Sequence, residues 1–173
     1  MKRFFLMLYI FLTALTVLAK DIKVVEGKPS MNKREGVIEV IFVWDGATFA
    51  NKHTLNEQWG EKYDQCLVDG ESFFIKGFNE KAKKLSMIIT EKENANYTMK
   101  VDFVNFDYFF SAMSAIPGHK HKVWANITMT DKNTGEVVWV VEVDEFVGDR
   151  DFVRYDSYTK MMTGLGERIA RLK

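Results

Sequence analysis

The feature that most constrains the fold is a long β-hairpin expected over residues 121–146. Both arms are rich in β-branched and aromatic residues, which favour strands. In the first arm, Val123 and Ala125 begin an alternation of apolar and more polar residues, which gives that arm one apolar face. Asp131 opens a tight turn, and Gly135 can take the positive φ that such a turn requires. A hairpin of this length needs cover over its apolar face.

Further apolar patterns predict more strands and two helical regions. A helical region begins near Thr54, as one helix or as two short helices broken near Gly60 or Gly70, and a second helix is expected over residues 152–172. The strands are expected at residues 22–25, 37–44, 85–90 and 97–106. The sequence therefore predicts an α/β (α+β) fold, a two-layer sandwich with a mixed or antiparallel sheet of about five strands and two helices packed on one face.

The first residues predict export. Lys2 and Arg3 precede a short apolar run that ends at Ala19, as in a secretory signal peptide over residues 1–19. The alternative is a membrane-spanning anchor, which is disfavoured because the run is short for a bilayer and meets Lys20 directly. Since no cysteine lies near the cleavage point, we expect no lipid anchor and no stable membrane anchor after cleavage. The protein is then periplasmic or extracellular.

Composition limits the number of domains and the class of partner. Removing 19 of the 173 residues leaves about 154, which suits a single α/β domain over residues 20–173. The 24 basic and 24 acidic residues of the chain balance, so bulk charge attracts neither nucleic acid nor an anionic membrane. Cys66 is the only cysteine, so no internal disulfide forms.

No motif with a known chemistry stands out. His119 and His121 form an H-x-H pair, but no acidic motif accompanies them at ligand spacing, so solvated histidines are favoured over a metal site. Gly164 and Gly166 lie in a helical pattern without the βαβ unit that dinucleotide binding requires. We expect no catalytic residue, no cofactor and no metal.

One apolar segment has neither the alternation of a strand nor a clear helical stripe. In the first interpretation it is a strand end and a buried connection that completes the core. In the second it is an exposed patch that binds a protein partner or a second copy of the chain, a role that suits aromatic and methionine side chains. The residues concerned are Phe106, Tyr108, Phe109, Phe110, Met113 and Ile116.

Several short motifs carry a resemblance to known proteins. They are Asp131-x-x-Thr134-Gly135-Glu136-Val137, Ala95-Asn96-Tyr97-Thr98, Phe78-Asn79-Glu80 and Gly166-x-x-Ile169-Ala170. Over most of the chain after the signal, this layout resembles a group of small uncharacterised secreted proteins of Bacteroidetes-type bacteria. More distantly it is similar to the periplasmic α/β domains of envelope assembly lipoproteins of the CsgG and LpoB types. The resemblance implies a fold and an envelope location, and it supplies no catalytic residue.

Three functions remain open from the sequence. The leading interpretation is a non-catalytic envelope or secreted module that binds a protein partner or itself. The second is a carrier of a small apolar ligand between sheet and helices. The third is a hydrolase without a readable motif.

The signal peptide gives a direct test. We expect cleavage after Ala19, because the charged start, the apolar run and the small residue at the boundary occur in the required order. The intact mass of the protein purified from its native host measures this, and a mass that still includes Met1 would contradict it.

Overall fold

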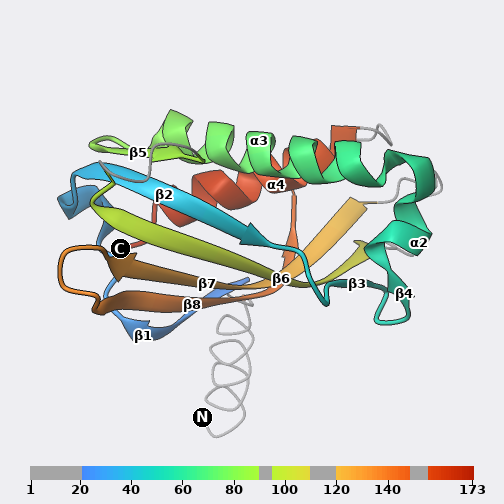
Figure 1. Cartoon of the computed structure of the whole chain (residues 1–173), viewed down its shortest axis with the longest axis horizontal. Coiled ribbons are helices and arrows are strands. Elements are labelled where there is room, and N and C mark those ends of the chain that lie inside the picture. Colours follow the sequence, from blue (N-terminus) through green and yellow to red (C-terminus); the bar gives the residue numbers. More distant parts are fainter. Residues whose placement is uncertain (1–20, 90–94, 110–119, 149–155) are drawn as a thin grey trace, which may run out of the picture.

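A computed structural model of the chain describes residues 21–89, 95–109, 120–148 and 156–173. Within these ranges eight strands form one mixed sheet, accompanied by helices on one of its faces (Figure 1). The strands are β1 (Ile22–Gly27), β2 (Gly36–Val43), β3 (Thr48–Phe49), β4 (His53–Thr54), β5 (Leu85–Ile88), β6 (Tyr97–Phe109), β7 (Lys120–Asp131) and β8 (Val137–Val147). The helices are α2 (Leu55–Trp59), α3 (Tyr63–Lys81) and α4 (Asp156–Ala170), with short 3-10 turns η1 (Met31–Lys33) and η2 (Gly60–Lys62).

The expected two-layer sandwich with a sheet of about five strands is wrong. The described residues form an eight-stranded sheet with the main order β1-β8-β7-β6-β2-β5, and β3 and β4 lie beside it. β3 and β4 have two residues each, too few to show an alternation in the sequence. They are held by tertiary contact instead, since Phe49 of β3 pairs in parallel with Phe106 of β6.

The sheet combines a local meander with strands that pair across long distances in the sequence. β6, β7 and β8 are consecutive antiparallel neighbours, and β1 closes that side against β8. β2 lies between β6 and β5 and is parallel to both. Parallel neighbours need a long crossover, and α3 lies in the connection between β2 and β5.

The hairpin predicted from the sequence is confirmed as β7 and β8. The Asp131 carboxylate accepts hydrogen bonds from the backbone N–H groups of Asn133 at 2.8 Å and Thr134 at 3.2 Å. Gly135 has a φ of 74° and donates its N–H to the Asp131 carbonyl at 2.9 Å. Side-chain and backbone bonds therefore fix the turn.

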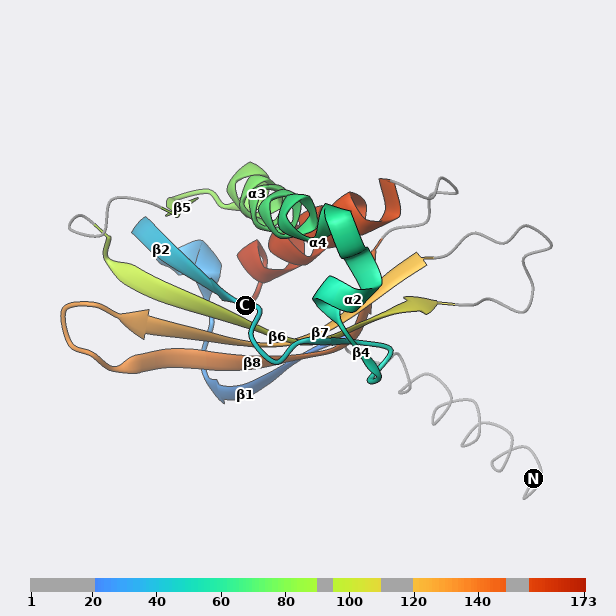
Figure 2. The ribbon, with the colours of Figure 1, turned by 45° about the vertical axis from the view of Figure 1, so that its right-hand side comes forward.

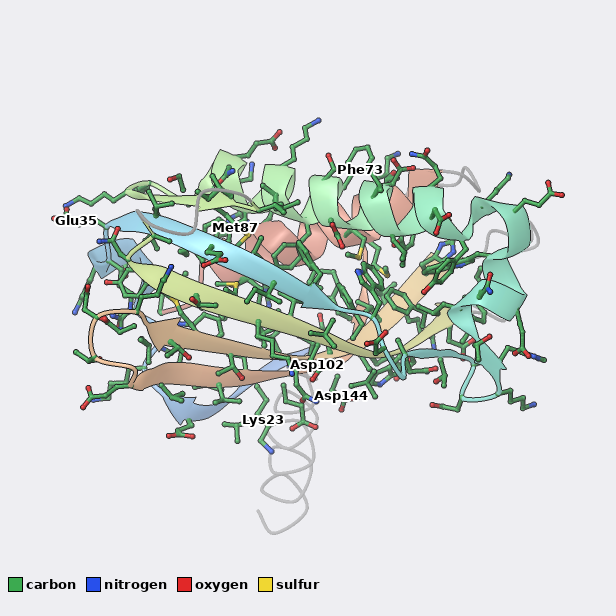
Figure 3. All side chains as sticks on the ribbon, viewed as in Figure 1. Lys23, Glu35, Phe73, Met87, Asp102 and Asp144 are labelled. Atoms are coloured by element: carbon green, nitrogen blue, oxygen red, sulfur yellow. The ribbon has the colours of Figure 1, made fainter. Side chains whose placement is uncertain are left out.

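Helices α3 and α4 cover one face of the sheet (Figures 1 and 2). Phe74 of α3, Leu165 of α4 and Trp139 of β8 are fully buried in one hydrophobic cluster, so the sheet and both helices share one core. The opposite face carries charged and polar side chains, among them Lys23, Asp102 and Asp144, which point away from the helices (Figure 3).

The two helices are in close contact because glycines remove side chains from their interface. A Cβ at Gly77 of α3 would collide with the carbonyl oxygen of Thr163, and one at Gly166 of α4 would collide with the carbonyl oxygen of Phe74. Gly164, two residues earlier, has only the Phe146 ring within 4 Å of such a Cβ, at 3.5 Å. The low helix propensity of Gly166 is therefore offset by packing.

Gly166 and Gly164 form a matched pair for a stability test. Gly166→Ala should lower the free energy of unfolding by roughly 1 to 3 kcal/mol, because the collision is with backbone that cannot move aside. Gly164→Ala should be neutral or stabilise by up to about 1 kcal/mol, since alanine favours the helix and its Cβ fits. Urea denaturation of both variants measures the difference, and equal effects would contradict close packing at Gly166.

Candidate functional site

A cleft opens where the first turns of α3 and α4 meet the ends of β6 and β7. Its volume is about 190 Å³. Four separate parts of the chain contribute to it, so it exists only in the folded protein. Its walls are Trp59, Lys62, Cys66, Asp69, Tyr108, His121, Tyr158 and Thr159.

Four rings in edge contact form one continuous part of its wall. The centroids of Tyr108 and His121 are 5.0 Å apart, those of His121 and Tyr158 are 5.6 Å apart, and those of Tyr158 and Trp59 are 5.6 Å apart. Phe106 lies behind them, 5.7 Å from Trp59. Edge contacts of this kind stabilise one another and hold the wall in a fixed shape.

Trp59 is positioned by the short helix α2. This helix begins with a capping box, in which Thr54 accepts from the Glu57 N–H at 3.2 Å and Glu57 accepts from the Thr54 N–H at 2.8 Å. Gly60, with a φ of 53°, ends α2 and turns the chain into α3. The break expected near Gly60 or Gly70 is therefore at Gly60, and it places Trp59 at the mouth of the cleft.

Tyr158 joins α4 to α3 at the base of the cleft. Its hydroxyl donates to the Cys66 carbonyl at 2.9 Å, and a Cβ at Gly70 would collide with that hydroxyl. Burial raises the pKa of Tyr158 well above its ordinary value, and nearby Cys66 and Asp69 act in the same direction. The phenol therefore remains a neutral hydrogen-bond donor.

Cys66 is the thiol of the cleft. Burial raises its pKa, Asp69 raises it further, and Lys62 acts in the opposite direction. A nucleophilic cysteine needs a lowered pKa, because the thiolate is the reactive form. The surroundings of Cys66 favour the inert thiol.

A histidine and a serine meet beside the cleft. His121 Nδ1 and Ser157 Oγ are 2.6 Å apart, although 36 residues separate them in the sequence. In serine hydrolases of the Ser-His-Asp type, the serine contacts Nε2 while Nδ1 is held by the carboxylate. Here the serine occupies Nδ1, so the contact suits fixing the ring in place better than activating a nucleophile.

The structure describes only part of the segment for which the sequence left open a buried connection or a partner-binding patch. Phe106 is fully buried beneath the cleft, and Tyr108 is half-buried in its wall. Phe109 is the last residue of β6. Phe110, Met113 and Ile116 lie outside the described residues, so their role stays a prediction.

Sequence reasoning missed the other walls of the cleft. The sequence pattern indicates a helix around Tyr158 and Lys62, and it gives no sign that Trp59 and Thr159 share a site with them. No local pattern could have indicated them, because they converge from α2, η2 and α4 only through tertiary packing.

The described part of the chain contains no group of three or more His, Cys, Asp or Glu side chains placed to hold a metal ion. It also contains no helix long and apolar enough to cross a membrane.

Comparison with known proteins finds solved structures of low similarity. No family model matches the sequence, and no curated protein is significantly similar to it. The PelC dodecamer from Paraburkholderia phytofirmans is 12% identical with a TM-score of 0.47, covering 86% of this chain and 94% of that one. A PelC point variant is also 12% identical, with a TM-score of 0.48 and coverage of 88% and 98%. A protein described as a neuraminyllactose-binding hemagglutinin homologue from Helicobacter pylori is 12% identical, with a TM-score of 0.30 and coverage of 84% and 83%.

The only cysteine of the chain reports on the electrostatics of the cleft. Alkylation by iodoacetamide needs the thiolate, so its rate should rise at a higher pH than for a free cysteine, whose pKa is about 8.5. Asp69→Asn should move this rise to lower pH, and Lys62→Gln should move it to higher pH, because they remove charges of opposite sign. Rate profiles from mass spectrometry measure the shifts, and two shifts in the same direction would contradict the assignment.

Proposed function

We propose that this chain is a non-catalytic, exported binding module that holds one apolar or aromatic side chain of a protein partner in the aromatic cleft. The observation that carries the proposal is the ring wall formed by Trp59, Tyr158, His121 and Tyr108 around an open space. Rigid aromatic walls of this kind provide much contact area at little cost in side-chain entropy.

The size of the cleft favours a protein side chain over a carried ligand. Its volume of about 190 Å³ is below the roughly 300 to 1,000 Å³ of pockets that enclose drug-sized molecules. It is also open to the surface, whereas a carrier of an apolar ligand needs enclosure. Lys62 and Asp69 lie at the same site as the rings and offer a donor and an acceptor to the polar backbone beside an inserted side chain.

The chemistry of the cleft supports binding over catalysis. The thiol of Cys66 is held in its neutral form, and the phenol of Tyr158 is committed to a backbone carbonyl. Ser157 meets His121 at Nδ1, which is the nitrogen that the orienting carboxylate holds in Ser-His-Asp enzymes. None of these groups is prepared to attack a substrate.

A variant that fills the cleft tests the proposal. Thr159→Phe should place a ring in the space and abolish partner binding or self-association, while thermal melting stays close to that of the unmodified chain. Val68→Phe is the matched control, because it adds a ring to α3 at a side chain that is 61% exposed and outside the cleft. Sedimentation measures self-association, and pull-down from the native envelope measures a partner.

Protection of Cys66 shows whether a bound protein occupies the cleft itself. Iodoacetamide should label Cys66 more slowly in the complex, or in the self-associated form, than in the isolated chain. Binding that leaves the labelling rate unchanged and survives Thr159→Phe would overturn the proposal.

A further inference from the structure

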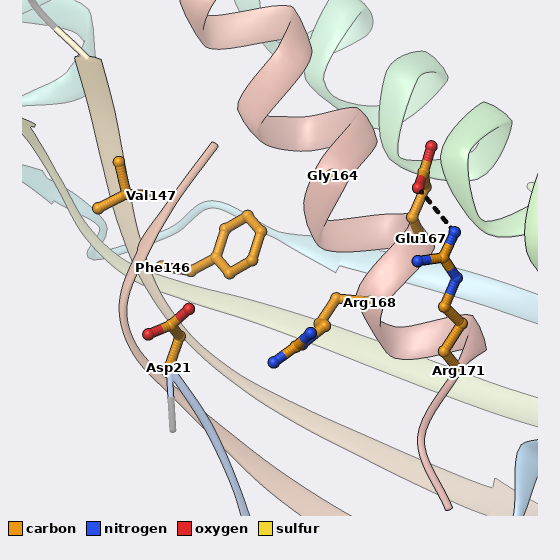
Figure 4. A pocket seen from close by; sticks show the side chains of 7 residues that line it. All are labelled: Asp21, Phe146, Val147, Gly164, Glu167, Arg168 and Arg171. Atoms are coloured by element: carbon orange, nitrogen blue, oxygen red, sulfur yellow. Dashed lines mark hydrogen bonds and ion pairs between the residues drawn. The ribbon is translucent and has the colours of Figure 1, made fainter. Parts of the chain in front are cut away.

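A second cavity lies near the other end of α4 and shares no residue with the aromatic cleft (Figure 4). Its volume is about 200 Å³. It opens between the start of β1, the end of β8 and the last turns of α4. The residues that line it are Asp21, Phe146, Val147, Gly164, Glu167, Arg168 and Arg171.

Two of its four charged side chains are already paired. Glu167 accepts from Arg171 at 3.4 Å and forms an ion pair with Lys81 at 3.7 Å. In the described part of the chain, the side chains of Asp21 and Arg168 make no hydrogen bond or ion pair. Figure 4 shows the Arg168 guanidinium and the Asp21 carboxylate on facing sides of the cavity, below the Phe146 ring. Opposite charges therefore border one space without contact between them.

The chemistry of these walls selects a ligand class. A guanidinium offers a planar fork of donors that fits a carboxylate or phosphate, and a carboxylate accepts from an ammonium group. Phe146 and Val147 add apolar surface beside the two charges. The four charged lining residues are two acids and two bases, so their formal charges cancel. A ligand that is itself neutral overall, with one charge of each sign, fits this balance better than a simple anion or cation.

We propose that this cavity binds a small zwitterion of the α-amino acid type. Its anionic group contacts the Arg168 guanidinium, its ammonium group contacts the Asp21 carboxylate, and its apolar part lies against Phe146. A free amino acid and a phosphoethanolamine headgroup share this chemistry, since each carries an anion and an ammonium a few bonds apart.

Calorimetric titration with four probes tests the charge requirement. Leucine and glycerophosphoethanolamine are zwitterions with one charge of each sign, acetate carries only the anion, and ethylamine carries only the cation. At least one zwitterion should bind about tenfold more tightly than acetate or ethylamine, and the tighter of the two identifies the source of the ligand. No saturable zwitterion binding with a Kd below about 1 mM would overturn the proposal.

Two variants assign the charges to their residues. Asp21→Asn should reduce zwitterion affinity to that of acetate, and Arg168→Gln should reduce it to that of ethylamine. Arg168 is exposed and Asp21 is half-buried, so both variants should melt like the unmodified chain. If Asp21→Asn fails to fold, Arg168→Gln alone decides the assignment.

A neighbouring basic cavity provides the control. It has a volume of about 280 Å³, and its charged walls are Lys81, Lys83, Arg171 and Lys173. Lys83→Gln changes this cavity and leaves the proposed site intact, so it should not affect zwitterion binding. Equal loss in Lys83→Gln and Arg168→Gln, or acetate binding as tight as that of the zwitterions, would place the ligand in the basic cavity and overturn the proposal.

Discussion

The close packing of α3 on α4 is the constraint on which the rest of the structure depends. Contact at Gly77 and Gly166 brings the helix backbones together, so that both helices reach one face of the sheet. Their apolar side chains then bury Trp139 and its neighbours completely. Because the glycines set the distance between the helices, they also set the positions of the groups at either end of the pair.

Helices α3 and α4 run in the same direction, so both N-termini lie at one end of the pair and both C-termini lie at the other. Tyr158, at the start of α4, contacts Cys66 near the start of α3, and Glu167 meets Lys81 where both helices end. Parallel helix dipoles gather partial negative charge at the shared C-terminal end. Basic side chains there, including Lys81 and Arg171, offset that charge. The aromatic cleft and the charged cavity at Asp21 and Arg168 therefore both result from the parallel arrangement of α3 and α4.

The aromatic cleft is the exposed end of the core. Ring contacts connect the buried Phe103 and Phe106 and the half-buried Trp44 to Trp59 and Tyr158 at the cleft. A wall that is continuous with the core cannot collapse when the space in front of it is empty. This rigidity suits a preformed site for one inserted side chain, since little ordering is left to be done on binding.

The sequence by itself determined the local structure of this protein. The β7–β8 hairpin with its Asp131 and Gly135 turn, the capping box at Thr54 and the buried stripe of α4 all depend on neighbours in the chain, and local patterns report such interactions. Only the tertiary structure decided the number of strands, the approach of the helices at Gly166, and the two cavities. β3 exists because β6 pairs with it, and β4 in turn pairs with β3. His121 and Ser157, which are in contact, and Asp21 and Arg168, which line one cavity, lie far apart in the chain. Packing across the whole domain sets the distances between such residues, and no short stretch of sequence carries that information.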